Sequence, residues 1–209
     1  MKLLLVGASG LVGGHLLDLA LSDPRITSVV ALTRRARPIH DKLEAPIVDF
    51  DTLDQTASWW SADAVICTLG TTMLRAGSQA AFRRVDHDYP LAVARLAHAH
   101  GTPIYVLNSA IGADADSRFF YNRVKGELEN ALASVGFRSL TFVRPGVIGG
   151  GRLEFRAGER LLVAALSLLG PMLPKRLRLN PAGRIAQALL EAALRGEAGR
   201  HIVKSDRLT

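Results

Sequence analysis

The chain has 209 residues, of which 48% are hydrophobic and 22% are charged. This is the composition of one folded domain, and it excludes intrinsic disorder. The formal net charge is +7, yet the basic residues form no zinc-finger spacing, no aromatic–basic box and no long basic run, so we expect no nucleic-acid partner.

A single cysteine, Cys67, excludes an internal disulfide and any multi-cysteine metal site, and we expect no bound metal. Low cysteine content is typical of a reducing compartment, and the apolar run at the N-terminus is too short for a secretory signal. No stretch approaches the roughly 20 apolar residues that a membrane span requires. The sequence therefore predicts a cytoplasmic protein without a membrane span.

Short apolar runs alternate along the chain with longer segments of helical period. The runs predict strands at residues 2–6, 28–32, 45–48, 64–67, 104–107, 140–143 and 201–204. The longer segments predict helices at residues 11–21, 78–99, 117–134, 159–169 and 182–194.

Strands that are apolar throughout and alternate with helices are typical of a parallel sheet covered on both faces. The sequence therefore predicts an α/β fold, a doubly wound parallel sheet (Rossmann fold). We expect a single domain over residues 1–209, in which residues 150–209 contribute a small cap on the substrate side.

A glycine-rich turn lies between the first predicted strand and the first predicted helix, with the spacing G-x-x-G-x-x-G. Glycine allows the backbone to turn tightly and to approach a diphosphate, while the helix N-terminus offers free N–H groups. The alternative is a plain turn without a ligand. We predict a dinucleotide site formed by Gly7, Ser9, Gly10, Leu11, Val12 and Gly13.

Thr33, Arg34 and Arg35 follow the second predicted strand. Enzymes that use NAD usually carry an acidic residue here, which accepts from the ribose 2′-hydroxyl. This chain has arginines instead, which can bind a 2′-phosphate through paired charge-assisted hydrogen bonds. The sequence therefore predicts NADP(H) in preference to NAD(H). The alternative is that Arg34 and Arg35 simply belong to a solvated loop. Asp49 and Phe50, after the third predicted strand, are candidate adenine contacts.

Tyr121 and Lys125 are four residues apart in a predicted helix, so they lie on one face. A nearby lysine cation favours tyrosinate and lowers the tyrosine pKa from about 10, which suits acid–base catalysis. Ser109, at the end of the fifth predicted strand, could donate to a substrate carbonyl oxygen. The Tyr-x-x-x-Lys spacing also arises by chance, but combined with the glycine turn it predicts a catalytic site of Ser109, Tyr121 and Lys125.

These motifs resemble the short-chain dehydrogenase/reductase superfamily, of the atypical kind. The resemblance is closer still to the Tat-interacting-protein-like oxidoreductases, and it is carried by residues 67–72, 85–89, 109–114, 121–127 and 144–147. It covers residues 1 to about 195 and implies a Rossmann fold that holds NADP(H). The large substrate domain of the superfamily's extended members is absent, which argues against a sugar-nucleotide substrate.

The resemblance also implies roles for particular residues. Tyr121 and Lys125 would bind the nicotinamide ribose, and Asp86 stands where the superfamily often carries asparagine. The remaining implied cofactor contacts are Thr68, Leu69, Gly70 and Thr71 on the adenosine side, Asn108, and Pro145, Gly146 and Val147 along the nicotinamide.

The sequence thus predicts an NADP(H)-dependent oxidoreductase that reduces a small carbonyl compound by hydride transfer, with Tyr121 as the acid–base group. One alternative is an NADPH-binding regulatory or scaffold protein with little or no turnover. A second is an epimerase or dehydratase that regenerates its cofactor. Helices equivalent to residues 78–99 and 117–134 often form a dimer interface in the superfamily, so we expect a monomer or a homodimer.

Overall fold

In the computed structural model, which describes residues 1–35, 40–149 and 179–209, one large sheet forms the centre of the protein. Its strand order is β3-β2-β1-β4-β5-β6-β9, and every neighbouring pair is parallel. The strand order runs outward from β1 in both directions, which is the arrangement of a doubly wound sheet. The predicted fold class is confirmed. The strands are β1 (Lys2–Val6), β2 (Ser28–Leu32), β3 (Leu43–Glu44), β4 (Ala64–Cys67), β5 (Ile104–Asn108), β6 (Ser139–Arg144) and β9 (Gly199–Lys204).

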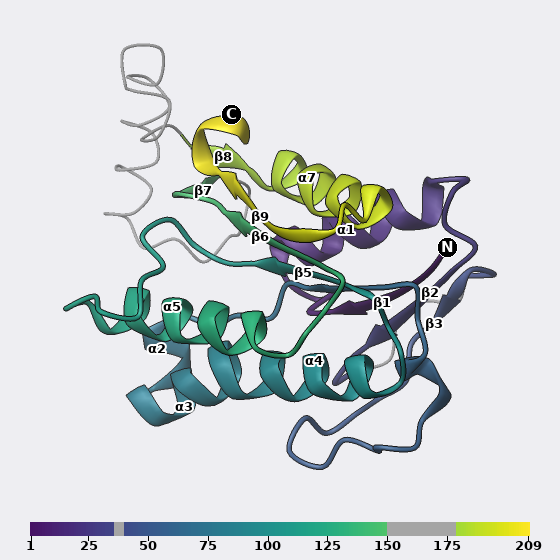
Figure 1. The fold of residues 1–209 in the computed structure, drawn as a ribbon, viewed down its shortest axis with the longest axis horizontal. Coiled ribbons are helices and arrows are strands. Elements are labelled where there is room, and N and C mark those ends of the chain that lie inside the picture. The colour runs from purple at the N-terminus through teal and green to yellow at the C-terminus, as the bar shows by residue number, and fades with distance from the viewer. Residues whose placement is uncertain (36–39, 150–178) are drawn as a thin grey trace.

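Helices cover both faces of this sheet. Figure 1 shows α1 and α7 on one face and α4 and α5 on the other. Alternate residues of β1 explain both layers, because Leu3 and Leu5 lie in the core under α1 and α7 whereas Leu4 and Val6 lie in the core under α4 and α5. The helices are α1 (Leu11–Ser22), α2 (Met73–Ala76), α3 (Gln79–Arg83), α4 (Tyr89–Ala99), α5 (Phe120–Ala133) and α7 (Ala182–Arg195).

The C-terminal part of the chain belongs to these layers. Helix α7 packs beside α1, and β9 extends the sheet beyond β6. Residues 179–209 therefore contribute a strand and a helix to these layers, while the substrate-side cap at residues 150–209 stays a prediction. Residues 150–178, with the helix predicted at 159–169, lie outside the described residues. A second, two-stranded ladder joins β7 (Ile148–Gly149) to β8 (Asn180–Pro181).

Several predicted bounds shift by one to three residues at an end. Two elements differ more, and a proline accounts for each. The third strand is Leu43–Glu44 rather than residues 45–48, because Pro46 has no N–H to continue the ladder. The predicted helix at 78–99 is interrupted by a π-helical segment, Arg84–Asp88, between α3 and α4. Pro90 lacks the N–H that would bond the carbonyl of Asp86 in a regular α-helix.

The carboxyl ends of β1, β4, β5 and β6 meet at one edge of the sheet, because the strands are parallel. Figure 1 shows that α2, the start of α5 and β7 lie at this same edge. Helix α5 lies close to the backbone of the loop that follows β5. At Gly126, an added Cβ would lie 2.2 Å from the backbone nitrogen of Ala115. Within the described ranges, no helix is long and apolar enough to cross a membrane.

Candidate active site

The turn between β1 and α1 requires glycine at two positions. Gly7 has a φ of +94°, and an added Cβ would lie 2.6 Å from the carbonyl carbon of Thr68. At Gly13 an added Cβ would lie 2.1 Å from the carbonyl oxygen of Gly7. The amide of Gly10 donates to that same oxygen at 2.9 Å. The turn is therefore compact, and side chains beyond hydrogen are excluded from its inner surface.

The first turn of α1 is suited to an anion. The helix begins at Leu11 after Gly10, with no side chain capping its amides and no acidic residue in its first turn. Ser9 is exposed beside it, whereas Val12 is buried in the core. Open amides at the positive end of a helix form a phosphate site, so this backbone fits a dinucleotide diphosphate.

The segment after β4 supports the glycine turn. The backbone N–H and the hydroxyl of Thr68 both donate to the carbonyl of Val6, at 2.8 and 3.1 Å. Leu69 packs against the core, and Gly70 is exposed close to the Asp86 carboxylate. The hydroxyl of Thr68 is thus used within the protein and holds the turn in place.

At the end of β2, Thr33 is structural and the two arginines are open to solvent. The buried Thr33 hydroxyl donates to the carbonyl of Arg35 at 2.8 Å, which closes the turn. The side chains of Arg34 and Arg35 are exposed beyond it. Because β2 is the neighbour of β1 in the sheet, these guanidinium groups flank the edge that carries the glycine turn.

Asp49 and Phe50 both make contacts within the protein. The Asp49 carboxylate accepts from the amide of Asp51 at 3.0 Å and from the hydroxyl of Thr52 at 3.3 Å, so it caps its own turn. The Phe50 ring is 8% exposed, and its centroid lies 5.4 Å from that of Tyr89 in the core. Little of this ring is left for a ligand.

Lys125 forms a buried ion pair with Asp86. The ammonium lies 2.8 Å from one carboxylate oxygen, and the two side chains are 4% and 1% exposed. The other carboxylate oxygen accepts from the amide of Thr71 at 2.8 Å. Burial on its own would lower the pKa of Lys125, but the charges of Asp86 and Tyr121 outweigh it and leave that pKa raised.

Tyr121 lies one turn before Lys125 on α5, with its ring centroid 5.7 Å from that of Phe82. Partial withdrawal of the phenol from water raises the pKa of Tyr121; Lys125 opposes this effect and Asp86 adds to it. The predicted lowering of this pKa is wrong, because burial of the phenol outweighs the charge of Lys125, and the Asp86 carboxylate adds to the effect of burial.

Ser109 is buried, and its hydroxyl donates to Glu129 at 2.5 Å. Arg144, at the end of β6, also donates to Glu129 through its Nε at 3.0 Å, and this bonding raises the pKa of Arg144. The hydroxyl proton of Ser109 is therefore directed to a carboxylate and not to a substrate carbonyl. Glu129 was missed at the sequence level, although its position four residues after Lys125 places it on the same helix face.

The segment after β6 is held by its neighbours. Pro145 is buried and accepts from the amide of Ile111 at 2.7 Å, and the amide of Gly146 donates to the side chain of Asn180 at 2.6 Å. Val147 is 47% exposed. The buried Asn180, which the sequence analysis did not single out, is fixed in turn by hydrogen bonds with Ser205.

The predicted residues thus fall into two groups. The glycine turn, Thr68–Thr71, Asp86 and the Tyr121–Lys125 pair are linked by direct contacts at the carboxyl edge. Asn108 ends β5 at this edge, and its buried Oδ1 has no hydrogen-bond partner among the described residues. Ser109, Asp49 and Phe50 instead make contacts within the protein.

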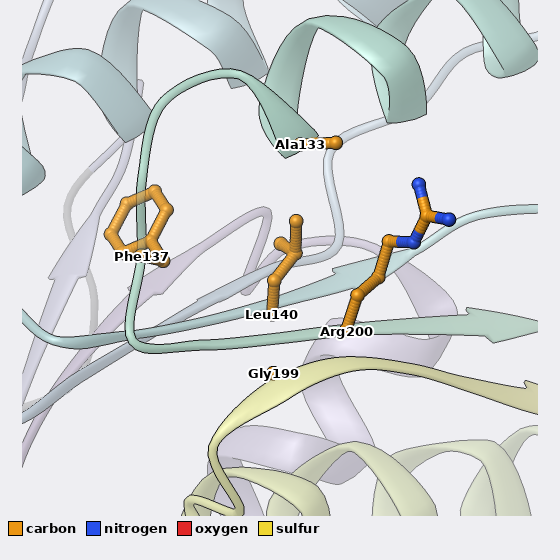
Figure 2. Close-up of a pocket in the computed structure, with 5 residues that line it drawn as sticks. All are labelled: Ala133, Phe137, Leu140, Gly199 and Arg200. Carbon is orange, nitrogen blue, oxygen red and sulfur yellow. The ribbon is translucent and has the colours of Figure 1, made fainter.

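Figure 2 shows a surface hollow that is separate from this edge. Its volume is about 260 Å³. It lies at the amino ends of β6 and β9, whereas the glycine turn follows the carboxyl end of β1. The hollow therefore does not mark the candidate site. Its lining residues are Ala133, Phe137, Leu140, Gly199 and Arg200.

Residues 7–151 match the family described as NAD(P)H-binding. The chain belongs to this family. The matched range begins at the glycine turn and includes the Tyr121–Lys125 pair, so the family match and the site coincide.

Curated relatives match about three quarters of the chain. The mitochondrial protein fmp52 of Emericella nidulans is 36% identical over 165 residues, which are 74% of this chain and 70% of that protein. Protein HTATIP2 of Rattus norvegicus is 38% identical over 162 residues, 75% of this chain and 66% of that protein. The resemblance to the atypical short-chain dehydrogenase/reductases is confirmed by these relatives.

Solved structures agree on the fold. MoeE5, in complex with UDP-glucose and NAD, has a TM-score of 0.74 at 16% identity, over 97% of this chain and 75% of that chain. The oxidoreductase ylbE of Lactococcus lactis has a TM-score of 0.69 at 16% identity, over 96% of this chain and 89% of that chain. Both support a Rossmann-type nucleotide-binding fold.

The expected cytoplasmic location is corrected by the same relatives. The matching fungal proteins, including those of Emericella nidulans and Candida albicans, are named as mitochondrial. These names contradict an assignment that rested on cysteine content and on the short apolar run at the N-terminus.

Proposed function

We propose that the protein is an NADP(H)-dependent oxidoreductase that reduces a small carbonyl compound, with Tyr121 as the proton donor. The observation that carries the proposal is the set of contacts joining the Tyr121–Lys125 pair to the glycine turn. Lys125 contacts Asp86, and Asp86 accepts from the amide of Thr71. Thr68, in the same segment after β4, packs against Gly7.

The residues fit the cofactor in three places. The open amides of α1 would bind the diphosphate, Arg34 and Arg35 would bind a 2′-phosphate, and Lys125 would bind the nicotinamide ribose. When bound, the reduced nicotinamide supplies the hydride that reaches the carbonyl carbon. The protein supplies the placement and the proton.

The proton step follows from the environment of Tyr121. A phenol with a raised pKa stays protonated at neutral pH, so it can donate to the carbonyl oxygen as negative charge develops there. The Lys125 ammonium then stabilises the phenolate left on Tyr121. Four apolar side chains exposed in the segments at this edge favour a carbonyl compound with apolar substituents: Leu74, Ile111, Phe119 and Val147.

The test of the mechanism is Tyr121→Phe. We expect turnover to fall by about a hundredfold or more while the NADPH dissociation constant changes little, because only the donated proton is removed. Tyr89→Phe is the matched control, since the Tyr89 hydroxyl donates to Asp51 away from Lys125. Turnover retained in Tyr121→Phe removes this residue from the mechanism.

The test of cofactor choice is calorimetry with NADPH and NADH. The double variant Arg34→Ala/Arg35→Ala should bind NADPH at least about tenfold more weakly, a loss of about 1.4 kcal/mol, and bind NADH as before. Arg195→Ala, an exposed arginine at the end of α7, should change neither affinity. Equal affinity of the unaltered protein for the two cofactors would refute the preference.

A second candidate function is an NADPH-binding regulatory protein with little turnover. The observation that favours it is the hydrogen bond from the Ser109 hydroxyl to Glu129, which uses the proton that a reductase would direct to the substrate carbonyl. A screen of apolar and polar aldehydes, ketones and quinones separates the two functions. Inactivity throughout, together with NADPH-dependent capture of a partner in a pull-down, would favour the regulatory protein.

A further inference from the structure

We propose that Asp86 is a positioning residue of this site: its carboxylate holds the Lys125 ammonium charged in a buried position and anchors the loop after β4 to the same point. The importance of this arrangement for turnover rests on the proposed function. The arrangement itself can be tested without cofactor or substrate.

Both oxygens of the Asp86 carboxylate are used. One lies 2.8 Å from the Lys125 ammonium, and the other accepts from the Thr71 amide at 2.8 Å. Asp86 is 1% exposed and Lys125 is 3% exposed, so water does not compensate either charge. A buried ion that loses its partner is strongly disfavoured, and each group therefore depends on the other.

The backbone at Asp86 explains how the carboxylate reaches α5. Asp86 lies in the π-helical segment Arg84–Asp88, where the amide of Tyr89 bonds the carbonyl of Arg84, five residues back. Pro90 cannot donate to the carbonyl of Asp86, so the regular ladder is broken at this residue. The wider turn packs directly against α5, which carries Lys125. Single π turns inside helices are frequent at functional sites.

Three titratable groups face Lys125 from the elements around it: Asp86 from the π-helical segment, Tyr121 from α5 itself, and Cys67 from β4. Burial raises the pKa of the Cys67 thiol, and burial also raises the pKa of the Tyr121 phenol. Both groups are therefore neutral at physiological pH. The negative charge that balances Lys125 is that of Asp86.

Two consequences follow for the site. Lys125 stays an ammonium at a depth where an unpaired lysine would lose its proton, so it can bind ribose hydroxyls as a donor. The loop that supports the glycine turn is tied to the same carboxylate, so the two ends of the proposed cofactor site share one anchor. An asparagine at this position would keep the shape of the side chain but would lose its charge.

The test is a pH titration of lysine ε-carbon resonances in the full-length protein. The chain has five lysines, and the Lys125 signal is the one lost in Lys125→Met. In the unaltered protein we expect Lys125 to titrate above its ordinary pKa of 10.5. In Asp86→Asn it should titrate below 10.5. Asp88→Asn, which removes a half-exposed carboxylate paired with His87, should leave it unchanged.

Protein stability gives an independent measurement. The double variant Asp86→Asn/Lys125→Met leaves no unpaired buried charge, so it should melt at a higher temperature than Asp86→Asn alone. If Asp86→Asn does not fold but the double variant does, the proposal is supported. If Lys125 of the unaltered protein titrates at or below 10.5, or if its titration is the same in Asp86→Asn, the proposal is overturned.

The proposal and the proposed function fail separately. An inactive protein whose Lys125 titrates as expected would contradict the oxidoreductase and leave the role of Asp86 intact. An active protein whose Lys125 pKa does not depend on Asp86 would contradict the role of Asp86 and leave the oxidoreductase intact.

Discussion

One face of α5 carries Tyr121, Lys125 and Glu129 at successive intervals of four residues. Each side chain meets a different partner: the Phe82 ring, the Asp86 carboxylate, and the Ser109–Arg144 pair, respectively. The first two contacts belong to the candidate site. The third links α5 to the ends of β5 and β6.

At the residue scale, we expect Ser109→Ala to affect stability more than turnover. The variant removes one hydrogen bond to a buried carboxylate that keeps its ion pair with Arg144, so the free energy of unfolding should fall by about 1.5–3 kcal/mol. Urea unfolding and steady-state rates measure the two effects. Ser117→Ala serves as the control, because the partly exposed Ser117 hydroxyl accepts only from the amide of Phe119 in the hydrogen bonds described. A large loss of rate at unchanged stability would instead indicate that Ser109 acts on the substrate.

The strand–turn–helix unit of β1 and α1 is the element on which cofactor binding depends. Gly13 and Gly14 are adjacent in α1, yet their surroundings differ. An added Cβ at Gly13 would lie 2.1 Å from the carbonyl oxygen of Gly7, whereas at Gly14 its nearest neighbour is the carbonyl oxygen of Ala8 at 3.8 Å. The turn therefore packs tightly against the helix at Gly13 but not at Gly14.

At the element scale, we expect Gly13→Ala and Gly14→Ala to have opposite effects. Gly13→Ala should distort the turn, lower the melting temperature and weaken NADPH binding. Gly14→Ala should stabilise the protein by about 0.5–1 kcal/mol, because alanine favours a helix interior over glycine. Thermal unfolding and calorimetry test both variants. Equal effects of the two substitutions would show that the contact between Gly13 and Gly7 is unimportant.

The sequence was sufficient to place elements and insufficient to pair side chains. Periodicity located every strand of the central sheet except β3, and it located the helices α1, α5 and α7, because burial on one or both faces leaves a regular pattern. It missed the π-helical segment, although Pro90 signalled a break. The partners of Asp86 and Ser109 lie on other elements, and spacing along the chain carries no information about them.

At the scale of the whole molecule, two pKa shifts make the free energy of unfolding depend on pH in the alkaline range. Lys125 and Tyr121 have raised pKa values in the folded protein. The folded state therefore holds these protons more tightly than the unfolded state, and the resulting stability is fully present below the ordinary pKa values. It is lost as the pH rises through the folded values.

We therefore expect the contribution of these two groups to the free energy of unfolding to be level near neutrality and to fall above about pH 10. Urea unfolding at a series of pH values measures it. The variant Asp86→Asn/Lys125→Met should show a shallower decline than the unaltered protein. A free energy of unfolding that rises above pH 10 would have the wrong sign.

The contacts that close the turn after β1 come from the chain itself: the hydroxyl of Thr68 bonds Val6, and the amide of Gly10 bonds Gly7. A binding loop shaped in this way by its own fold loses little conformational entropy when a ligand arrives. Nucleotide capture should then be limited by diffusional encounter, and differences in affinity between nucleotides should show mainly in how long each one stays.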